Sequence, residues 1–117
     1  MPEAAPRPEA APRSLAEVRD RIDGIDAELV ALLTRRQSLV RAAAAFKTDE
    51  QAVRAPDRVE KVIAAVRERA EAAGLAPDVA EAVWRAMIGA FIALELTEHQ
   101  RLGCAAPPLR AAVSPGW

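Results

Sequence analysis

The sequence predicts an all-α fold of three helices, the first of them much longer than the other two. Apolar residues recur at alternating steps of three and four in three separate segments, which is the spacing of one helix face. The two central prolines, Pro56 and Pro77, fall between those segments, where a proline can open a helix. No segment alternates apolar and polar residues as a strand does, so we expect no sheet.

Within the 117 residues we expect one helical domain, at 14–102, between two tails. Seven of the nine prolines lie in residues 1–12 and 107–117. Low-complexity sequence of this kind cannot bury a core, so residues 1–13 and 103–117 are expected to be disordered. The first tail also lacks the apolar run of a signal peptide.

The first helix is expected from Ser14 to Phe46. Ser14 and Glu17 form an S-x-x-E capping box, which marks a helix start. A helix of about 33 residues would be ~50 Å long at 1.5 Å per residue. We expect the stretch 48–56 to end it. Its apolar stripe consists of Leu15, Val18, Ile22, Ile25, Leu29, Leu32, Leu39, Ala43 and Phe46.

The second helix is expected from Pro56 to Ala73, with Gly74 as its stop, and the third from Pro77 to about Leu102. The apolar stripe of the second consists of Val59, Val62, Ile63, Val66 and Ala70. The inner face of the third consists of Val79, Val83, Trp84, Met87, Ile88, Phe91 and Leu94.

The length of the first helix predicts a homodimer. A compact globule of ~90 residues has a radius of gyration near 12 Å, so a ~50 Å helix projects well beyond it. Its apolar stripe nevertheless continues throughout, and two shorter helices can cover only part of it. A second copy of the chain in an intertwined dimer is the simplest cover, although a long coiled-coil pairing satisfies the same pattern.

The composition excludes several function classes. The net charge is −1, aromatic residues make up 3%, and no basic stripe occurs, so we expect no nucleic-acid partner. No apolar run approaches a membrane span. Cys104 and His99 are each the sole residue of their type, so we expect no disulfide framework, no metal and no other cofactor. A cytoplasmic location is the expectation for such a chain.

Two cations interrupt the apolar face of the first helix. Arg36 occupies the position that the three-four series skips, and Lys47 falls within ~20° of the same direction. They are ~16 Å apart along the axis, so two long side chains can grip the two ends of a dicarboxylate. The alternative for Arg36 is a buried salt bridge or a register-setting residue at a helix seam.

Two further cations, Arg19 and Arg58, and one carboxyl, Glu95, are candidates for the same site. Arg19 lies ~25 Å from Arg36 along the helix, so it can reach that site only from the other subunit; the alternative is an exposed Arg19 paired with Asp23 or Glu17. Arg58 opens the second helix and is a weaker candidate for an anion contact.

Glu95 lies on the apolar face of the third helix with Phe91 and Ile88. It is either a counter-ion for Arg36 or Lys47, or a carboxyl that points into the ligand site. Burial favours its neutral form, whereas nearby cations favour the charged form. The remaining charged residues near the ends of the two long helices are expected at the surface: Arg35, Arg41, Glu98 and, beside them, His99.

Residues 14–101 resemble the all-helical (type II) chorismate mutases. The strings that carry the resemblance are LAEVRDRIDGID, LLTRRQSLV, FK at 46–47 and AVRAPDRV at 52–59. Among these proteins the match is most similar to the isochorismate pyruvate lyases of salicylate biosynthesis, which share the last two strings. The resemblance implies an intertwined dimer of three-helix chains.

The resemblance also implies roles for the candidate residues. Arg36 would bind one substrate carboxylate, and Arg19 of the second subunit would bind the other. Lys47 would contact a carboxylate and the ether oxygen. Glu95 stands where the family has Gln or Glu, and it would donate a hydrogen bond to the ether oxygen.

The implied activity is a pericyclic Claisen rearrangement of chorismate to prephenate, with no covalent intermediate. Isochorismate cleavage to salicylate and pyruvate is the alternative. Val59 favours the alternative, because bacterial mutases commonly carry there a Glu that receives the substrate's C4 hydroxyl, whereas Glu95 is a mutase-like substitution. A further alternative is a non-catalytic helical dimer that serves as an interaction subunit, and the inward cations argue against it.

Overall fold

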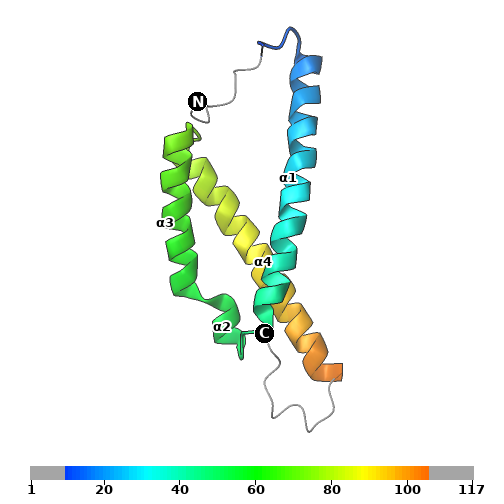
Figure 1. Ribbon diagram of the computed structural model, residues 1–117, viewed down its shortest axis with the longest axis vertical. Helices are drawn as coiled ribbons and strands as arrows, with labels where there is room; N and C mark the ends of the chain where they lie inside the picture. The colour runs from blue at the N-terminus through cyan, green and yellow to red at the C-terminus, as the bar shows by residue number, and fades with distance from the viewer. Residues whose placement is uncertain (1–9, 106–117) are drawn as a thin grey trace, which may run out of the picture. The chain divides into compact units, whose positions relative to one another are not determined.

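The computed structural model describes residues 10–105, with side chains through Gln100, and these residues form helices with short connections and contain no strand. The helices are α1 (Leu15–Ala44), α2 (Glu50–Arg54), α3 (Pro56–Ala73) and α4 (Pro77–Ala105), as Figure 1 shows. The all-α prediction with three long helices is therefore confirmed. The chain forms two compact units, one ending at Arg36 and the other beginning at Gln37.

The start of α1 is capped by Ser14. The Ser14 hydroxyl oxygen accepts a hydrogen bond from the Glu17 backbone N–H at 3.0 Å. The Glu17 carboxylate accepts from the backbone N–H of Arg13 at 3.2 Å and pairs with Arg21, and these contacts lower the Glu17 pKa. The Ser14 half of the predicted capping box is confirmed, while Glu17 reaches Arg13 rather than Ser14.

The first unit has no core of its own. The one helix in its described residues is α1, so its apolar stripe has no second apolar surface within the unit. Ile22, Ile25, Leu29 and Leu32 are each about half exposed, and the buried residue of α1 is Ala44 in the second unit. At 30 residues α1 would be ~45 Å long. Exposed apolar surface on this scale marks an interaction site, which supports the predicted homodimer without demonstrating it.

In the second unit, α1 ends in a tightened turn. The N–H groups of residues 45, 46 and 47 donate to the carbonyls three residues earlier, at 3.3, 2.9 and 3.1 Å. The stretch 48–56 was predicted only to interrupt the helix, and it also contains α2. Asp49 caps α2 by accepting from the Ala52 N–H at 2.8 Å, and Val53 of α2 is buried.

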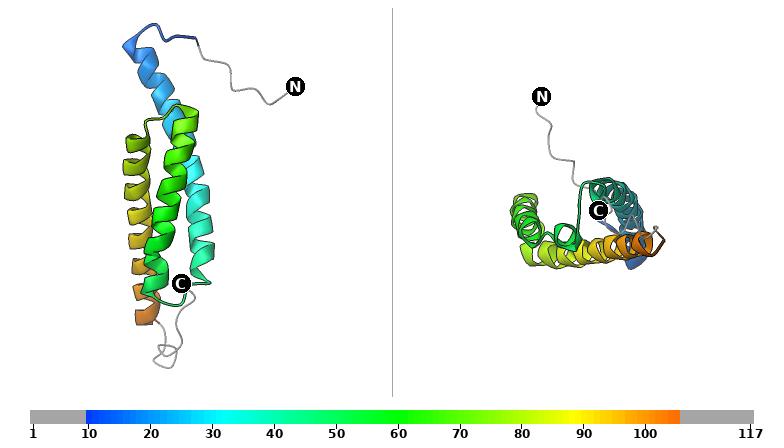
Figure 2. Two further views of the ribbon diagram at one scale, coloured as in Figure 1. Left: turned by 90° about the vertical axis from the view of Figure 1, so that its left-hand side faces the viewer. Right: turned by 90° about the horizontal axis from the view of Figure 1, so that it is seen from below.

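α3 and α4 form an antiparallel pair joined by a short turn (Figures 1 and 2). Gly74 ends α3 at φ 86°, a left-handed conformation that suits glycine, and its N–H bonds the Glu71 carbonyl while Leu75 N–H bonds the Ala70 carbonyl. The predicted bounds of α3 are confirmed. α4 continues to Ala105, beyond the predicted end near Leu102. Of the tails predicted at 1–13 and 103–117, residues 1–9 and 106–117 lie outside the described residues, while residues 103–105 belong to α4.

The core between α3 and α4 differs in one respect from the prediction. Val66, Ala70 and Ala80 form a buried cluster, against which Val62 and Trp84 pack. The predicted inward residues Val79 and Val83 are instead 52% exposed in the single chain. Successive helical residues point ~100° apart, so once Ala80 and Trp84 face α3, their neighbours 79 and 83 turn away.

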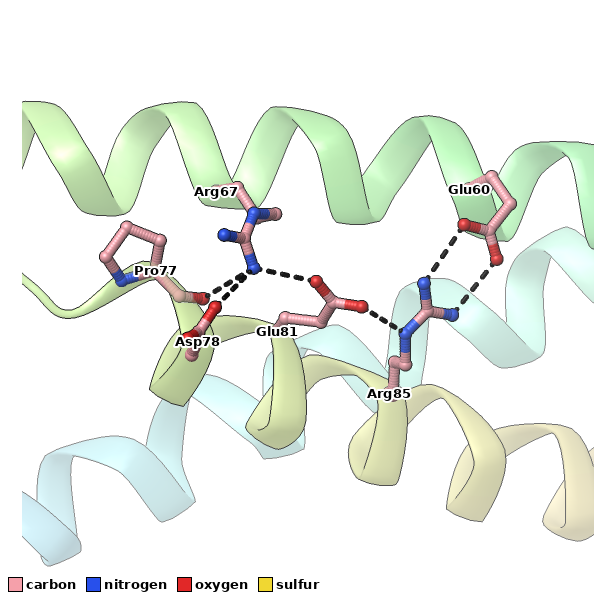
Figure 3. A network of polar contacts seen from close by, with 6 residues as sticks. All are labelled: Glu60, Arg67, Pro77, Asp78, Glu81 and Arg85. Atoms are coloured by element: carbon pink, nitrogen blue, oxygen red, sulfur yellow. Dashed lines mark hydrogen bonds and ion pairs between the residues drawn. The ribbon is translucent and has the colours of Figure 1, made fainter.

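A ladder of ion pairs also joins α3 to α4 (Figure 3). Arg85 forks onto both carboxylate oxygens of Glu60 at 3.0 Å and bonds Glu81 at 2.7 Å. Arg67 bonds the other oxygen of Glu81 at 2.8 Å and Asp78 at 3.0 Å. Hydrogen bonds from Arg85 lower the pKa of Glu60 and of Glu81, and the same carboxylates raise the Arg85 pKa.

Candidate functional site

Lys47 and Glu95 form an ion pair where the chain leaving α1 meets α4. The Lys47 Nζ lies 3.3 Å from Oε1 and 3.3 Å from Oε2 of Glu95. The Glu95 side chain is 3% exposed and that of Lys47 is 25% exposed. Glu95 is the buried charged residue among the described side chains. Arg36 or Lys47 was predicted as the counter-ion of Glu95, and this ion pair is formed with Lys47.

Apolar packing fixes the two elements that carry this pair. Ala44 and Val53 form a buried cluster, and Ile92 and Leu96 of α4 pack against it. Lys47 follows Ala44 by three residues and its N–H bonds the Ala44 carbonyl, while Glu95 directly precedes Leu96. The carboxyl therefore lies beside apolar side chains, where a charge is costly unless it is paired.

A second ion pair also joins the end of α1 to α4. The Arg41 Nη2 is 2.9 Å from the Glu98 Oε2, and these side chains are 50% and 21% exposed. Both residues were predicted to lie at the surface; Arg41 is exposed as predicted, whereas Glu98 is half-buried, and the prediction did not include their ion pair. The missed signal is helical spacing, because Glu98 lies three residues after Glu95 and Arg41 three residues before Ala44.

The other predicted site residues are Arg19, Arg36 and Arg58. Arg58 is exposed in the first turn of α3, and the structure does not bring it to the Lys47–Glu95 pair. Arg36 is half-buried and Arg19 is exposed, and both belong to the first unit. The alternative for Arg19 expected an exposed side chain, as the structure has it, but no ion pair joins Arg19 to Asp23 or Glu17 among the described side chains, and Glu17 pairs with Arg21 instead.

The Lys47–Glu95 pair offers a small set of chemical capabilities. The ammonium can bind an anion or donate to a developing oxyanion. The carboxyl can accept from that ammonium when ionised, or donate one hydrogen bond when protonated. Within residues 10–100 no group of three or more His, Cys, Asp or Glu side chains is arranged to hold a metal ion. Among the described helices none is both long and apolar enough to cross a membrane.

Comparison with known proteins identifies the family. Residues 18–96 match the family described as chorismate mutase type II. The chain is also similar to an isochorismate pyruvate lyase of Pseudomonas aeruginosa, with 37% identity over 82 residues that cover 70% of this chain and 81% of that protein. No solved structure gave a significant match. The matched segment includes all five predicted site residues, at positions 19, 36, 47, 58 and 95. The chain therefore belongs to the chorismate mutase type II family and is a chorismate mutase-like enzyme.

Proposed function

We propose that this enzyme rearranges chorismate to prephenate at a site built around Lys47 and Glu95. The observation that carries the proposal is the 3.3 Å contact between a half-buried ammonium and a carboxyl that is 3% exposed. Burying such a pair costs desolvation energy that an apolar pair of similar size would avoid. Its presence within the family-matched segment is what a site for an anionic ether would require.

The proposed reaction is a single pericyclic step. The ether C–O bond of the substrate breaks while a C–C bond forms between its side chain and its ring, so no nucleophile, oxidant or proton donor is consumed. The protein has two tasks: to hold the flexible enolpyruvyl ether in its reactive shape, and to stabilise negative charge that develops on the ether oxygen. The Lys47 Nζ would supply the charged donor to that oxygen.

The second donor would be Glu95 in its protonated form. With both oxygens against the Lys47 Nζ, an ionised Glu95 acts as an acceptor and has no hydrogen to donate. A substrate oxygen that enters between the two side chains would be attracted by the ammonium and repelled by a carboxylate. We therefore expect the active form to carry a proton on Glu95 and the activity to fall as the pH rises.

The two substrate carboxylates require further cations. We assign one carboxylate to Arg36 and the other to Arg19 of a second subunit, with Arg58 as a weaker contact. The exposed apolar stripe of α1 supports the dimer that this assignment needs, because residues 10–36 of the first unit contain no other surface that covers it.

The shared site can be tested by subunit complementation. Arg19→Ala and Lys47→Ala homodimers should each be inactive, whereas unfolding and refolding them together should restore about a quarter of wild-type activity. Half of the random dimers would be mixed, and each mixed dimer would contain one complete site of two. Lack of recovery in dimers shown to be mixed would contradict a site shared between subunits.

A second candidate reaction is the cleavage of isochorismate to salicylate and pyruvate. Two observations favour it: the similarity to the Pseudomonas aeruginosa lyase, and an apolar Val59 where the mutase pattern has a hydroxyl-binding Glu. Val59 is half-buried on α3, one residue after Arg58. An apolar side chain there leaves the C4 hydroxyl of chorismate without its acceptor.

Turnover of the two isomers separates the candidates. The purified protein would be incubated with chorismate and with isochorismate at about pH 5 and pH 7.5. Prephenate formed from chorismate, with no salicylate from isochorismate, supports the proposal. Fast salicylate release with feeble prephenate formation would replace it by the lyase. No turnover of either compound would favour a non-catalytic interaction dimer.

A further inference from the structure

We propose that Arg41 and Glu98 are positioning residues, whose ion pair holds the end of α1 on α4 so that Lys47 meets Glu95. This inference rests on the proposed function of Lys47 and Glu95. It concerns two residues that lie outside the set predicted to touch the substrate.

The Arg41–Glu98 and Lys47–Glu95 ion pairs lie one after the other along the contact between the end of α1 and α4. Along the chain leaving α1 the order is Arg41, Ala44, Lys47, and along α4 the partners come in reverse order, with Glu98 facing Arg41 and Glu95 facing Lys47. Residues three apart on a helix share a face, so both carboxylates project toward the same side of α4.

The apolar contact between the two ion pairs cannot set the register by itself. Its central residue, Ala44, presents a single methyl group, and apolar burial has no preferred direction. After α1 the backbone up to Lys47 is held by three hydrogen bonds that span three residues instead of four, and such bonds have poorer geometry than those of an α-helix. The ion pair between Arg41 and Glu98, with 2.9 Å between Nη2 and Oε2, adds an attraction between two specific residues at the last turn of α1.

Arg41 also removes a competitor for the lysine. Glu95 and Glu98 are like charges three residues apart, and an ammonium between them can pair with either. Glu98 is more exposed than Glu95, at 21% against 3%, so an ammonium loses less contact with water when it pairs with Glu98. With Glu98 engaged by Arg41, the Lys47 ammonium is left to the buried carboxyl.

The test compares kcat with KM in single and swapped variants. Arg41→Gln and Glu98→Gln should each lower kcat by about tenfold with KM changed less than twofold, because the reacting groups are displaced while the groups assigned to the substrate carboxylates remain. Glu98→Arg alone should be more harmful, since its guanidinium competes for Glu95, and adding Arg41→Glu should restore most of the lost kcat. Arg54→Gln, at an exposed arginine of α2, is the matched control.

Three outcomes would overturn the inference. One is wild-type kcat in both Gln variants. Another is a rise of KM in the Arg41 variants alone, which would make Arg41 a substrate contact. The third is no rescue by the charge swap. If Arg41→Gln fails to fold, Arg41→Lys keeps the charge but loses the planar guanidinium, and it should retain more activity than Glu98→Gln does.

A readout without turnover separates this inference from the proposed function. If the wild-type enzyme converts neither substrate, the proposed function fails, and the position of Lys47 can still be followed by the carbon-13 carboxyl signal of Glu95. That signal should move in Arg41→Gln and Glu98→Gln toward its position in Lys47→Ala. An unchanged signal in both variants would contradict the positioning role.

Discussion

Two groups of ion pairs anchor α4, and they lie in different surroundings. At the start of α4, Arg85 and Glu81 belong to an exposed ladder that reaches α3 (Figure 3). Further along α4, the buried Glu95 holds the half-buried Lys47. Glu60, Arg67 and Arg85 of the ladder are each at least 40% exposed, and pairing between exposed groups costs little and contributes little. By contrast, the Glu95 side chain is 3% exposed and that of Lys47 is 25% exposed, so this pair is largely shielded from water.

This difference separates stability from function. Residues of an exposed ladder can be neutralised without leaving a charge stranded in the protein. Residues of a buried pair depend on each other, because removal of one leaves the other unpaired in apolar surroundings. We therefore expect changes in the ladder to affect mainly the α3–α4 pair, and changes at residues 47 and 95 to affect mainly catalysis.

The largest expected effect is that of Lys47→Ala. Loss of one donor to the developing oxyanion should lower kcat by about 10²–10³-fold, or roughly 3–4 kcal/mol. Steady-state kinetics would measure this, with far-UV circular dichroism and size-exclusion chromatography to check that the variant keeps the helical content and the oligomeric state of the wild type. Lys61→Ala, at an exposed lysine of α3, should match the wild type. Unchanged kcat in a folded Lys47→Ala protein would contradict the proposed site.

An intermediate effect is expected for Glu95→Gln, and its sign depends on pH. The amide donates a hydrogen bond at every pH, whereas the carboxyl donates only when protonated. The wild-type rate should therefore fall with rising pH while the variant rate stays level, so the ratio of variant to wild type increases. PH–rate profiles would show this. Parallel profiles would contradict a protonated Glu95, and Glu71→Gln on α3 should keep the wild-type profile.

The smallest effect is expected in the ladder. The hydrogen bond from Arg85 lowers the Glu60 pKa below 4.5, so the stabilisation is present above that pH and is lost as the pH falls through the lowered pKa. Glu60→Gln should melt slightly below the wild type at neutral pH, and the gap should close as the pH falls through the lowered pKa of Glu60. Thermal melts would measure it, with turnover unchanged. A gap that widens in acid would reverse the sign of this contribution.

Glu68→Gln provides the control for the ladder. Glu68 is exposed on α3 and makes no ion pair with a described residue, so its variant should melt with the wild type throughout this pH range. If it reproduced the behaviour of Glu60→Gln, the effect would reflect net charge rather than the contact with Arg85.

Local chemistry made much of the fold predictable. Ser14, Pro56 and Gly74 marked helix ends because capping, ring geometry and a left-handed turn act within a few residues. α2 was missed, because a five-residue helix carries too few apolar positions to show a period. Its signal was Asp49, whose side chain caps the first turn.

The candidate site was predictable in its residues but not in its contacts. Lys47 and Glu95 stood out because charges on apolar faces need partners. Arg41 and Glu98 did not, because on a helical wheel they resemble ordinary surface, and only the approach of α4 to the end of α1 brings them within 2.9 Å.

The sequence by itself determined the three long helices, their bounds to within a few residues, and which buried charges required explanation, since periodicity, caps and the cost of burying a charge are local properties. Only the tertiary structure decided that Lys47, 48 residues away from Glu95 along the chain, is its partner in this pair. It also decided that Ala80 rather than Val79 enters the α3–α4 core. Such choices depend on the rotation and register of whole helices, which many weak contacts fix together.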